Sequence, residues 1–357
     1  MASIPTEPIG SIPRPKELLD ALTRRAMGQL SAARLEPLFD AAVRDTLRRF
    51  EEAGSPVATD GEQRKSSFAT YPLEGFPHLA PEGVSIPFKD GHTRRLPKLT
   101  KGPFRYARYA ARDLEKALAA AKVPLKQAVI SASALSLLYP AEGVPGYPRQ
   151  DFIEDLVSEA EKDIRQCLAL GAAVQIDFTE GRLAVKLDPS LGLLKRFVDL
   201  NNMVLERFTA AERARIGVHT CPGGDQDSTH SADVDYAALL PELFRLKAGS
   251  FYLQLAGEPD HPRVLALLKP YAQGERRLFI GVTDVLSPDL ETPEEVRDRV
   301  LEAARFIAPE RLGTCDDCGF SPFADDASTS RDTAFAKVRA RVAGTQLAAE
   351  RLGARRG

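Results

Sequence analysis

The amino-acid sequence predicts an α/β protein that folds as a (β/α)8 barrel, a TIM barrel, in a single domain over residues 1–357. Three observations favour this fold. Short runs rich in Val, Ile and Leu alternate with longer amphipathic stretches, which is typical of a parallel sheet covered by helices. The length of 357 residues is one that α/β barrels reach as one domain. The 26 Pro and 25 Gly residues are scattered, so no segment has the composition of a linker.

The predicted strands are short and apolar, as strands buried on both faces of a parallel sheet should be. They occupy residues 8–12, 56–60, 128–133, 172–178, 215–219, 250–255, 278–283 and 311–314. Eight is the number of strands in a (β/α)8 barrel. A doubly wound sheet is the alternative architecture, but no G-x-G-x-x-G motif follows the first strand.

Amphipathic periodicity predicts helices between these strands. Apolar side chains recur at spacings of three and four within 32–53 and within 151–170, and Gly171 is a natural end for the second helix. Thr292 is followed by a proline and then, three residues after the cap, by Glu295. This pattern predicts the start of a further helix.

One segment departs from the alternation of strands and helices. Within residues 81–108, the pair Asp90-Gly91 stands between two short β-like runs. Asp-Gly is a favoured two-residue turn in β-hairpins. We therefore expect an inserted β-hairpin in this segment.

Composition and charge exclude several classes of protein. The 48 Lys and Arg residues against 50 Asp and Glu give a net charge of −2, which lacks the basic excess of a nucleic-acid-binding protein. No apolar run approaches the roughly 18–20 residues that cross a bilayer, and residues 1–15 lack the features of a secretory signal. Four cysteines are too few for a disulfide framework. We therefore expect a cytoplasmic protein with reduced thiols and with no nucleic-acid or membrane partner.

Polar side chains gather where the predicted strands end. Catalytic residues of (β/α)8 barrels lie at the carboxyl ends of the strands. The residues at or just after these ends are Ser11, Glu62, Asp177, His219, Cys221, Glu258, Asp284, Cys315 and Cys318. This coincidence is the main argument from the residues for a functional site at the barrel mouth.

A group of one His and two Cys is a candidate metal site. His219 and Cys221 lie two residues apart at a strand end, so in extended chain they face the same side. Cys318 ends another strand that a barrel can bring near, and such a set suits zinc with one position open for a substrate. The alternative is that these are small packed residues, but their place at strand ends favours a metal. A redox role for the pair Cys315 and Cys318 is disfavoured, because a turn follows it instead of a helix.

Two carboxylates at strand ends are candidates for ligand binding. Asp177 closes a buried strand, where a charge is costly unless it is paired or hydrogen-bonded. A substrate ammonium is one such partner, and a neighbouring Arg or Lys is the other. The same reasoning selects Glu62, with Asp60 as its competitor. His230 is the remaining histidine most open to a role, because its loop follows Cys221.

Five short segments stand in order along nearly the whole chain. They are Ile9-Gly10-Ser11 followed by Pro13, Gly61-Glu62, Gln175-Ile176-Asp177, His219-x-Cys221 and Asp317-Cys318-Gly319. Together they resemble the cobalamin-independent methionine synthase family, specifically its catalytic C-terminal barrel. In that family a zinc ion binds the thiol of homocysteine, and the thiolate attacks a methyl donor. The resemblance implies a Zn²⁺-dependent methyltransferase of methionine biosynthesis that acts on a small, homocysteine-like thiol.

The resemblance also implies roles for individual residues. The zinc ligands carried over by position are His219, Cys221 and Cys318. The residues that would hold the amino-acid part of the acceptor are Ser11, Glu62 and Asp177. The family's fourth zinc ligand is a Glu at a strand end; its place falls on Gln254 here, and the nearest Glu is Glu258.

Departures from the family pattern bear on the methyl donor. Gln-Ile-Asp is commonly followed by Glu-Pro in the family, but Phe178-Thr179 follows here. The full-length enzymes have an N-terminal barrel involved in folate binding and a Trp near the folate. This sequence contains no Trp, and we expect no second barrel. We therefore expect a donor other than folate, for example a methyl group delivered by a carrier protein.

Three other functions are alternatives to this one. The epoxyalkane:coenzyme M transferase group also has an H-x-C…C zinc site and alkylates a different thiol. A decarboxylase of the uroporphyrinogen decarboxylase fold group needs no zinc and wants basic residues for several carboxylates, so the ordered His/Cys/Cys set disfavours it. A structural zinc site is disfavoured because Cys221 and Cys318 lie far apart in the sequence, whereas structural ligands usually lie close together.

Overall fold

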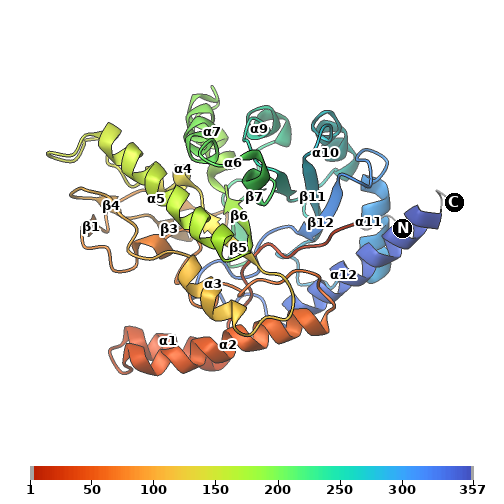
Figure 1. Cartoon of the computed structure of the whole chain (residues 1–357), viewed down its shortest axis with the longest axis horizontal. Helices are drawn as coiled ribbons and strands as arrows, with labels where there is room; N and C mark the ends of the chain where they lie inside the picture. Colours follow the sequence, from red (N-terminus) through yellow and green to blue (C-terminus); the bar gives the residue numbers. More distant parts are fainter. Residues whose placement is uncertain (1–3, 355–357) are drawn as a thin grey trace.

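Six of the predicted strands form one parallel sheet at the centre of the molecule (Figure 1). The structure is a computed structural model that describes residues 4–354. The strands are β5 (Lys126–Ile130), β6 (Ala173–Asp177), β7 (Ile216–Thr220), β10 (Ser250–Leu253), β11 (Arg277–Thr283) and β12 (Leu312–Asp316). Their spatial order is β12-β11-β10-β7-β6-β5, and every neighbouring pair is parallel.

The first two predicted strands are irregular extended segments, so the expectation of eight regular strands was wrong at these two positions. A single parallel bridge joins Thr6 to β12, and another joins Ala58 to the residue before β5. The two segments also meet, because the Ile12 N–H donates to the Gly61 carbonyl at 3.0 Å. No continuous ladder closes the ring among the described residues, but the (β/α)8 order of the chain is kept.

Proline gives the physical reason for this irregularity. Pro5 and Pro8 lie in the first segment and Pro56 begins the second. Proline has no N–H to donate to a strand ladder, so it is confined to edges, strand starts and bulges. These two segments therefore keep the positions of strands without the regular pairing.

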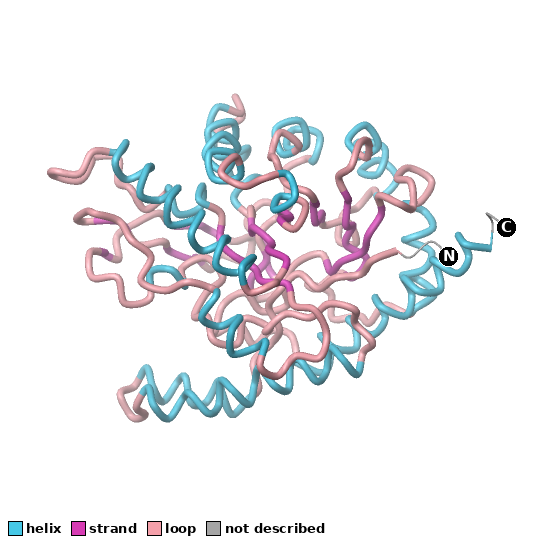
Figure 2. Tube along the Cα trace, viewed as in Figure 1, coloured by secondary structure: helices cyan, strands magenta, loops and turns pink. Residues whose placement is uncertain are grey.

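Helices cover the outside of the sheet (Figures 1 and 2). The helices are α1 (Lys16–Ala26), α2 (Ala32–Glu52), α3 (Ala111–Leu118), α4 (Ala132–Ser136), α5 (Arg149–Ala169), α6 (Glu180–Leu187), α7 (Gly192–Leu205), α8 (Ala210–Arg213), α9 (Tyr236–Leu243), α10 (His261–Leu268), α11 (Pro293–Ala303) and α12 (Arg331–Ala354), with 3₁₀ turns η1 (Tyr71–Leu73) and η2 (Lys269–Tyr271). The two helices predicted from periodicity are α2 and α5. The predicted start of α11 is confirmed: Thr292 and Glu295 form a reciprocal capping box.

The predicted hairpin is confirmed, and its paired strands lie between residues 79 and 99. It contains β1 (Leu79–Ala80), β2 (Ser85–Pro87), β3 (Thr93–Arg95) and β4 (Lys98–Leu99). β2 pairs with β3, and β1 pairs with β4, both antiparallel. Gly91 has φ +95° between β2 and β3, a conformation that glycine adopts without strain. The Lys89 N–H donates to the Thr229 carbonyl at 2.9 Å, so this hairpin contacts β9 (Ser228–Thr229), which pairs with β8 (Gly224–Asp225).

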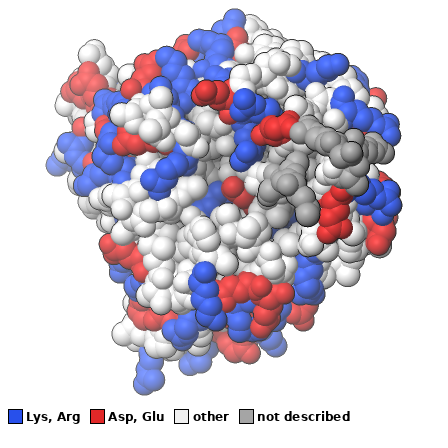
Figure 3. Space-filling view, turned by 45° about the vertical axis from the view of Figure 1, so that its right-hand side comes forward, with Lys and Arg blue, Asp and Glu red and all other residues white. Residues whose placement is uncertain are grey.

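The interior of the sheet is filled by strand side chains. All five residues of β5, of β7 and of β12 are buried, as expected where helices cover the outer face of a parallel sheet. On the face displayed in Figure 3, basic and acidic side chains are intermingled. No helix within residues 4–354 is both long enough and apolar enough to cross a bilayer.

Candidate metal centre and substrate cavity

Three side chains that the sequence places far apart meet at the carboxyl ends of β7 and β12. His219 lies in β7, Cys221 directly follows that strand, and Cys318 follows β12 after one intervening residue. One ligand atom from each residue lies within 4.8 Å of the other two. The sulfur atoms of Cys221 and Cys318 are 3.2 Å apart. β7 and β12 are not neighbours in the sheet, so the curvature of the barrel brings these residues together.

The chemistry of this cluster fits a metal ion. His219 is only 1% exposed, and among the described residues no oxygen or nitrogen atom hydrogen-bonds to its ring nitrogens, which leaves the neighbouring Cys221 thiol as their contact. Buried polar atoms normally find a partner, because leaving one without a hydrogen bond costs free energy. A metal ion would be such a partner for one nitrogen. A nitrogen donor beside two sulfur donors is a set that zinc prefers.

The two thiols differ in their acidity. The Cys318 thiol, followed by the His219 ring, lowers the pKa of Cys221 well below its ordinary value, although burial opposes this. The Cys221 Sγ also accepts a hydrogen bond from the Gly223 N–H at 3.4 Å. The same pairing, together with burial, raises the pKa of Cys318.

Two glycines beside the cluster lie so close to neighbouring side chains that any larger residue would collide with them. A Cβ at Gly223, whose φ is +72°, would lie 1.8 Å from Nε2 of His230. A Cβ at Gly319 would lie 2.2 Å from Oγ of Ser11. The segments after Cys221 and after Cys318 can therefore pack closely against the cavity wall only with glycine at these positions.

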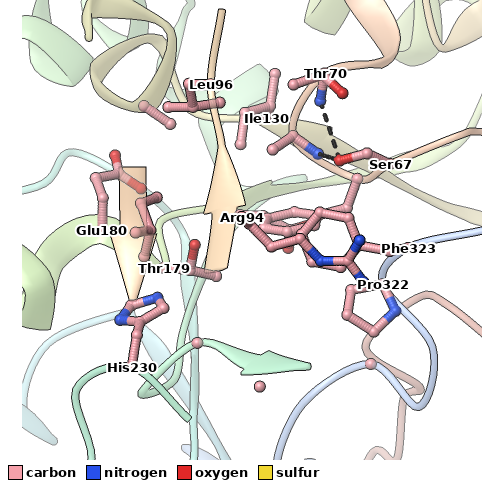
Figure 4. A pocket seen from close by; sticks show the side chains of 18 of the residues that line it. Ser67, Thr70, Arg94, Leu96, Ile130, Thr179, Glu180, His230, Pro322 and Phe323 are labelled. Atoms are coloured by element: carbon pink, nitrogen blue, oxygen red, sulfur yellow. Dashed lines mark hydrogen bonds between the residues drawn. The ribbon is translucent and has the colours of Figure 1, made fainter. Parts of the chain in front are cut away.

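A cavity of about 400 Å³ opens beside the cluster and is lined by side chains from several strand ends. Figure 4 shows part of its wall, with Glu180, Thr179 and His230 on one side and Phe323 and Pro322 on the other. The predicted site residues that line it are Ser11, Glu62, Asp177, His219 and Cys318. The structure thus brings two of the three predicted metal residues, and all three predicted acceptor residues, to the lining of one cavity.

Asp177 closes β6 and is 5% exposed. Its Oδ1 accepts a hydrogen bond from Nε2 of Gln175 at 2.7 Å. Burial raises the pKa of the Asp177 carboxyl, while His219 acts in the opposite direction. No Arg or Lys lies within 4.0 Å of this carboxylate among the described residues. The alternative partner named above, a neighbouring Arg or Lys, is therefore not present within that distance.

Glu62 and Asp60 have different roles in the same turn. Glu62 lines the cavity, whereas Oδ1 of Asp60 accepts a hydrogen bond from the Glu62 N–H at 2.9 Å and so holds the turn. Glu62 has φ +54°, which is uncommon for a residue with a side chain. Burial raises the pKa of Glu62, and Lys65 is the main group that opposes this shift. Of the two candidates, Glu62 is the one placed to meet a ligand.

Ser11 is held by the segment that follows Cys318. Its Oγ accepts a hydrogen bond from the Ser321 N–H at 3.1 Å, and its carbonyl accepts one from the Phe320 N–H at 3.0 Å. Because the hydroxyl oxygen acts as acceptor toward the backbone, its own proton is available to donate to a ligand.

Three residues from strand ends lie outside the cluster. The Glu258 carboxylate is 2.6 Å from Nη2 of Arg182 and is not one of the three clustered ligands. Asp284 accepts a hydrogen bond from the Leu286 N–H at 3.0 Å. Cys315 is fully buried and packs in a small apolar group with Tyr252.

Comparison with known proteins places the chain in a family. Residues 149–343, more than half of the chain, match the family described as "Cobalamin-independent synthase, Catalytic domain". The chain belongs to the cobalamin-independent methionine synthase family. It is therefore a methyltransferase of the methionine-biosynthesis type, as the sequence predicted. This membership also argues against the decarboxylase alternative.

Relatives resemble this family member over nearly their whole length. The chain is 24% identical to the methionine synthase of Sulfurisphaera tokodaii over 353 residues, which covers 98% of this chain and 94% of the relative. It is also 24% identical to the methionine synthase of Saccharolobus solfataricus, with 98% and 96% covered.

Solved structures of similar proteins share the fold. A B12-independent methionine synthase from a Shewanella species in complex with selenomethionine has a TM-score of 0.75 at 19% identity, covering 99% of this chain and 100% of that one. A protein described as the putative vitamin-B12 independent methionine synthase from Listeria monocytogenes has a TM-score of 0.73 at 21% identity, with 97% and 98% covered.

Sequence reasoning missed one acidic residue in the cavity of this synthase-family chain. Glu180 begins α6 and lines the cavity. Its Oε1 accepts a hydrogen bond from Oγ of Ser131 at 2.6 Å and another from the hydroxyl of Ser133. Burial raises the pKa of Glu180 to about 7. The available signal was its position three residues after Asp177, just beyond the carboxyl end of a strand, where catalytic residues of (β/α)8 barrels lie.

The inserted hairpin supplies the outer wall of the cavity, which the sequence also did not indicate. Phe88 and Arg94 lie on it and line the cavity. Nη2 of Arg94 lies 3.1 Å from Oδ1 of Asp225, and its Nη1 lies 2.9 Å from Oδ2 of Asp325. His92 reaches the same Asp225 with Nε2 at 3.0 Å. The hairpin is thus fastened to the loop that follows Cys221.

Proposed function

We propose that this chain transfers a methyl group to the thiol of homocysteine in a zinc-dependent reaction, as a single domain acting in the cytoplasm. One observation carries the proposal: a His/Cys/Cys cluster within 4.8 Å adjoins a cavity whose lining includes the buried acids Glu62 and Asp177. The cluster provides donors for a metal, and the carboxylates provide partners for an ammonium group. The names of the methionine synthase relatives support this choice of reaction.

In this proposal the residues of the cluster, His219, Cys221 and Cys318, hold the zinc ion. A bound zinc ion would lower the pKa of a thiol that coordinates it, and would so supply a thiolate at neutral pH. Glu258 could serve as a fourth ligand only after leaving its ion pair with Arg182. Three protein ligands leave a position for a substrate thiol.

The other side chains would hold and orient the acceptor. Glu62 and Asp177 are both buried in the cavity wall, and burial disfavours their charged forms. An α-ammonium group placed between them would favour the charged forms. Ser11, whose hydroxyl proton is not used within the protein, would donate to the α-carboxylate of the acceptor. Holding the acceptor at both groups would aim its thiol toward the cluster and so favour attack on the donor.

A thiol that carries a sulfonate is disfavoured as acceptor. This is the epoxyalkane:coenzyme M transferase alternative. Two carboxylates that line the cavity would repel a sulfonate placed near them. Homocysteine, with an ammonium group, complements them.

We also propose a methyl donor other than folate. The sequence contains no Trp to take the place of the Trp that lies near the folate in the family. Purified, zinc-loaded protein should therefore form methionine from homocysteine and a methyl donor in a panel that includes methylcobalamin and sulfonium compounds, as read by mass spectrometry. It should show little turnover with mono- or triglutamylated methyltetrahydrofolate.

Each part of the proposal has its own contrary result. Turnover with triglutamylated folate on the order of 0.1–10 per second would overturn the donor assignment and leave the acceptor assignment standing. Coordination of a thiol by zinc releases a proton. Absence of proton release on mixing homocysteine with the zinc-loaded protein would overturn the acceptor assignment.

A further inference from the structure

A lysine is buried directly beneath the acceptor side of the cavity. Lys65 is 2% exposed, and its Nζ donates to the carbonyl of Ala128 at 2.8 Å. The same Nζ lies 3.4 Å from Oε2 of Glu62 and 4.4 Å from the centroid of the Tyr71 ring. An isolated buried ammonium would be costly, so its retention requires the acids around it.

Several acids make the charge of Lys65 tolerable. Burial alone would lower the pKa of Lys65, but Glu62, Asp60 and Asp177 outweigh it and raise that pKa. Lys65 is therefore charged, and it is the only Lys or Arg within 4.0 Å of the Glu62 carboxylate among the described residues.

Another buried cation nearby has a different task. Nη2 of Arg14 donates to the carbonyl of Glu62 at 2.9 Å and to the carbonyl of Lys65 at 2.7 Å. Arg14 therefore fastens the backbone of the turn. It leaves the carboxylate of Glu62 to Lys65.

The Glu62 side chain has little freedom to turn away. Its Oε2 lies beside Lys65, and its Oε1 lies against Gly10, where a Cβ would be 2.5 Å from this oxygen. Its backbone N–H is held by Asp60. The carboxylate is thus confined between the first extended segment of the barrel and Lys65, at the edge of the cavity.

We propose that Lys65 is a positioning and specificity residue, which holds Glu62 as an anion facing the cavity and so selects thiols that carry an ammonium group. The inference rests on the proposed function, in which Glu62 binds the α-ammonium of homocysteine. Without Lys65, burial and the neighbouring Asp177 would favour the neutral acid. A neutral Glu62 would have much less attraction for the ammonium group, although its size would be almost unchanged.

The test compares two thiols that differ only in the amino group. Zinc-loaded wild-type and Lys65→Met proteins are titrated calorimetrically with L-homocysteine and with 4-mercaptobutyrate. We expect Lys65→Met to bind homocysteine at least about tenfold more weakly, with the affinity for 4-mercaptobutyrate unchanged within about twofold. If Lys65 had only a structural role, the substitution would weaken the binding of both thiols equally, and this result would overturn the proposal. Unchanged affinity for both thiols would also overturn it.

A matched control is provided by Lys126→Met. Lys126 is also fully buried; its Nζ lies 3.4 Å from Oε2 of Glu7 and 3.8 Å from the centroid of the Tyr252 ring. It lies at the start of β5, at the opposite end of the strand from the site. This variant should bind both thiols as the wild type does. If Lys126→Met also lost affinity for homocysteine and not for 4-mercaptobutyrate, the loss would follow from removing any buried charge, and the proposal would fail.

A double-mutant cycle keeps the test decisive if Lys65→Met alone is poorly folded. In a Glu62→Gln background, adding Lys65→Met removes a charge that no longer has its partner, and it should cause no further loss of homocysteine affinity. An additive loss would overturn the proposal. If the wild type itself binds 4-mercaptobutyrate as tightly as homocysteine, it is the acceptor assignment under the proposed function that fails.

Discussion

At the scale of single residues, the mouth of the barrel concentrates groups that are costly to bury in a protein without a ligand. Within residues 4–354, no oxygen or nitrogen atom hydrogen-bonds to the His219 ring, and no Lys or Arg lies within 4.0 Å of the Asp177 carboxylate. Such groups cluster at functional sites more often than elsewhere. A bound cation and a bound amino-acid ligand would together offset the free-energy cost of burying the cluster and the carboxylates.

Cys318→Ser should remove the metal from the protein. Cys318 supplies one of the two sulfur donors of the cluster, and a serine hydroxyl is a much poorer zinc ligand at neutral pH. Elemental analysis should show close to one zinc per wild-type chain and clear loss from the variant. Cys315→Ser is the control, because Cys315 is buried among apolar side chains and is not part of the cluster. Full zinc occupancy in Cys318→Ser would remove this residue from the site.

Glu180→Gln should become more stable relative to the wild type as the pH rises. The pKa of Glu180 is raised from about 4.5 to about 7 by burial. The contribution of Glu180 to the free energy of unfolding is therefore fully present below the pKa of Glu180 in the unfolded chain. It is lost as the pH rises through the pKa of Glu180 in the folded protein. Between pH 5 and 8 the difference in Tm, variant minus wild type, should increase on the order of 2–4 °C. The exposed Glu115→Gln variant should show no such trend, and a decreasing difference for Glu180→Gln would contradict the assignment.

At the scale of elements, the hairpin β2–β3 is fastened across the cavity by a few polar contacts. Asp225 lies in β8, directly after the loop that carries Cys221, and it accepts hydrogen bonds from Arg94 and pairs with His92. Movement of the hairpin would therefore be coupled to the loop beside the metal cluster.

Arg94→Ala should loosen the hairpin without releasing the metal. The substitution removes the hydrogen bonds to Asp225 and the ion pair to Asp325. The backbone N–H of Lys89, which donates to the Thr229 carbonyl, should then exchange with solvent faster, by on the order of tenfold. Hydrogen exchange read by mass spectrometry over 85–95 measures this, with zinc content checked in parallel. Arg95→Ala, an exposed neighbour on β3, is the comparison, and equal effects of the two variants would refute the fastening role of Arg94.

At the scale of the whole molecule, the cluster joins parts of the barrel that the sheet does not pair directly. β10 and β11 stand between β7 and β12 in the sheet order, yet Cys221 and Cys318 lie 3.2 Å apart at their sulfur atoms. A metal bound there would connect the two strand ends across the mouth. It would bind the folded chain and not the unfolded one, and would therefore stabilise the fold.

Removal of zinc should lower the melting temperature. A ligand at about 100 times its Kd stabilises a fold by roughly 2.7 kcal/mol, which corresponds to a decrease in Tm of several degrees on chelation. Differential scanning calorimetry before and after treatment with a chelator measures the change. In Cys318→Ser the chelator should have little effect. A wild-type Tm that does not respond to chelation would mean that the metal does not bridge the strand ends.

Local features of the fold could be predicted from the sequence because they depend on neighbours along the chain. The capping box at Thr292 and the Asp90-Gly91 turn are set by residues within a few positions of one another, and both are present. The two irregular segments were mistaken for regular strands. Apolar composition alone does not reveal where a ladder breaks, and the prolines that break it act through pairing with distant strands.

The sequence by itself determined the order of the elements and the chemical types at the strand ends, and these were enough to name His219, Cys221 and Cys318 as one candidate group. Only the tertiary structure decided which of the neighbouring candidates meet. It turned Glu62 to the cavity and Asp60 to the backbone, paired Glu258 with Arg182, and set a hairpin over the site. Such choices depend on contacts between segments far apart in the chain, and those contacts are fixed only when the whole barrel packs.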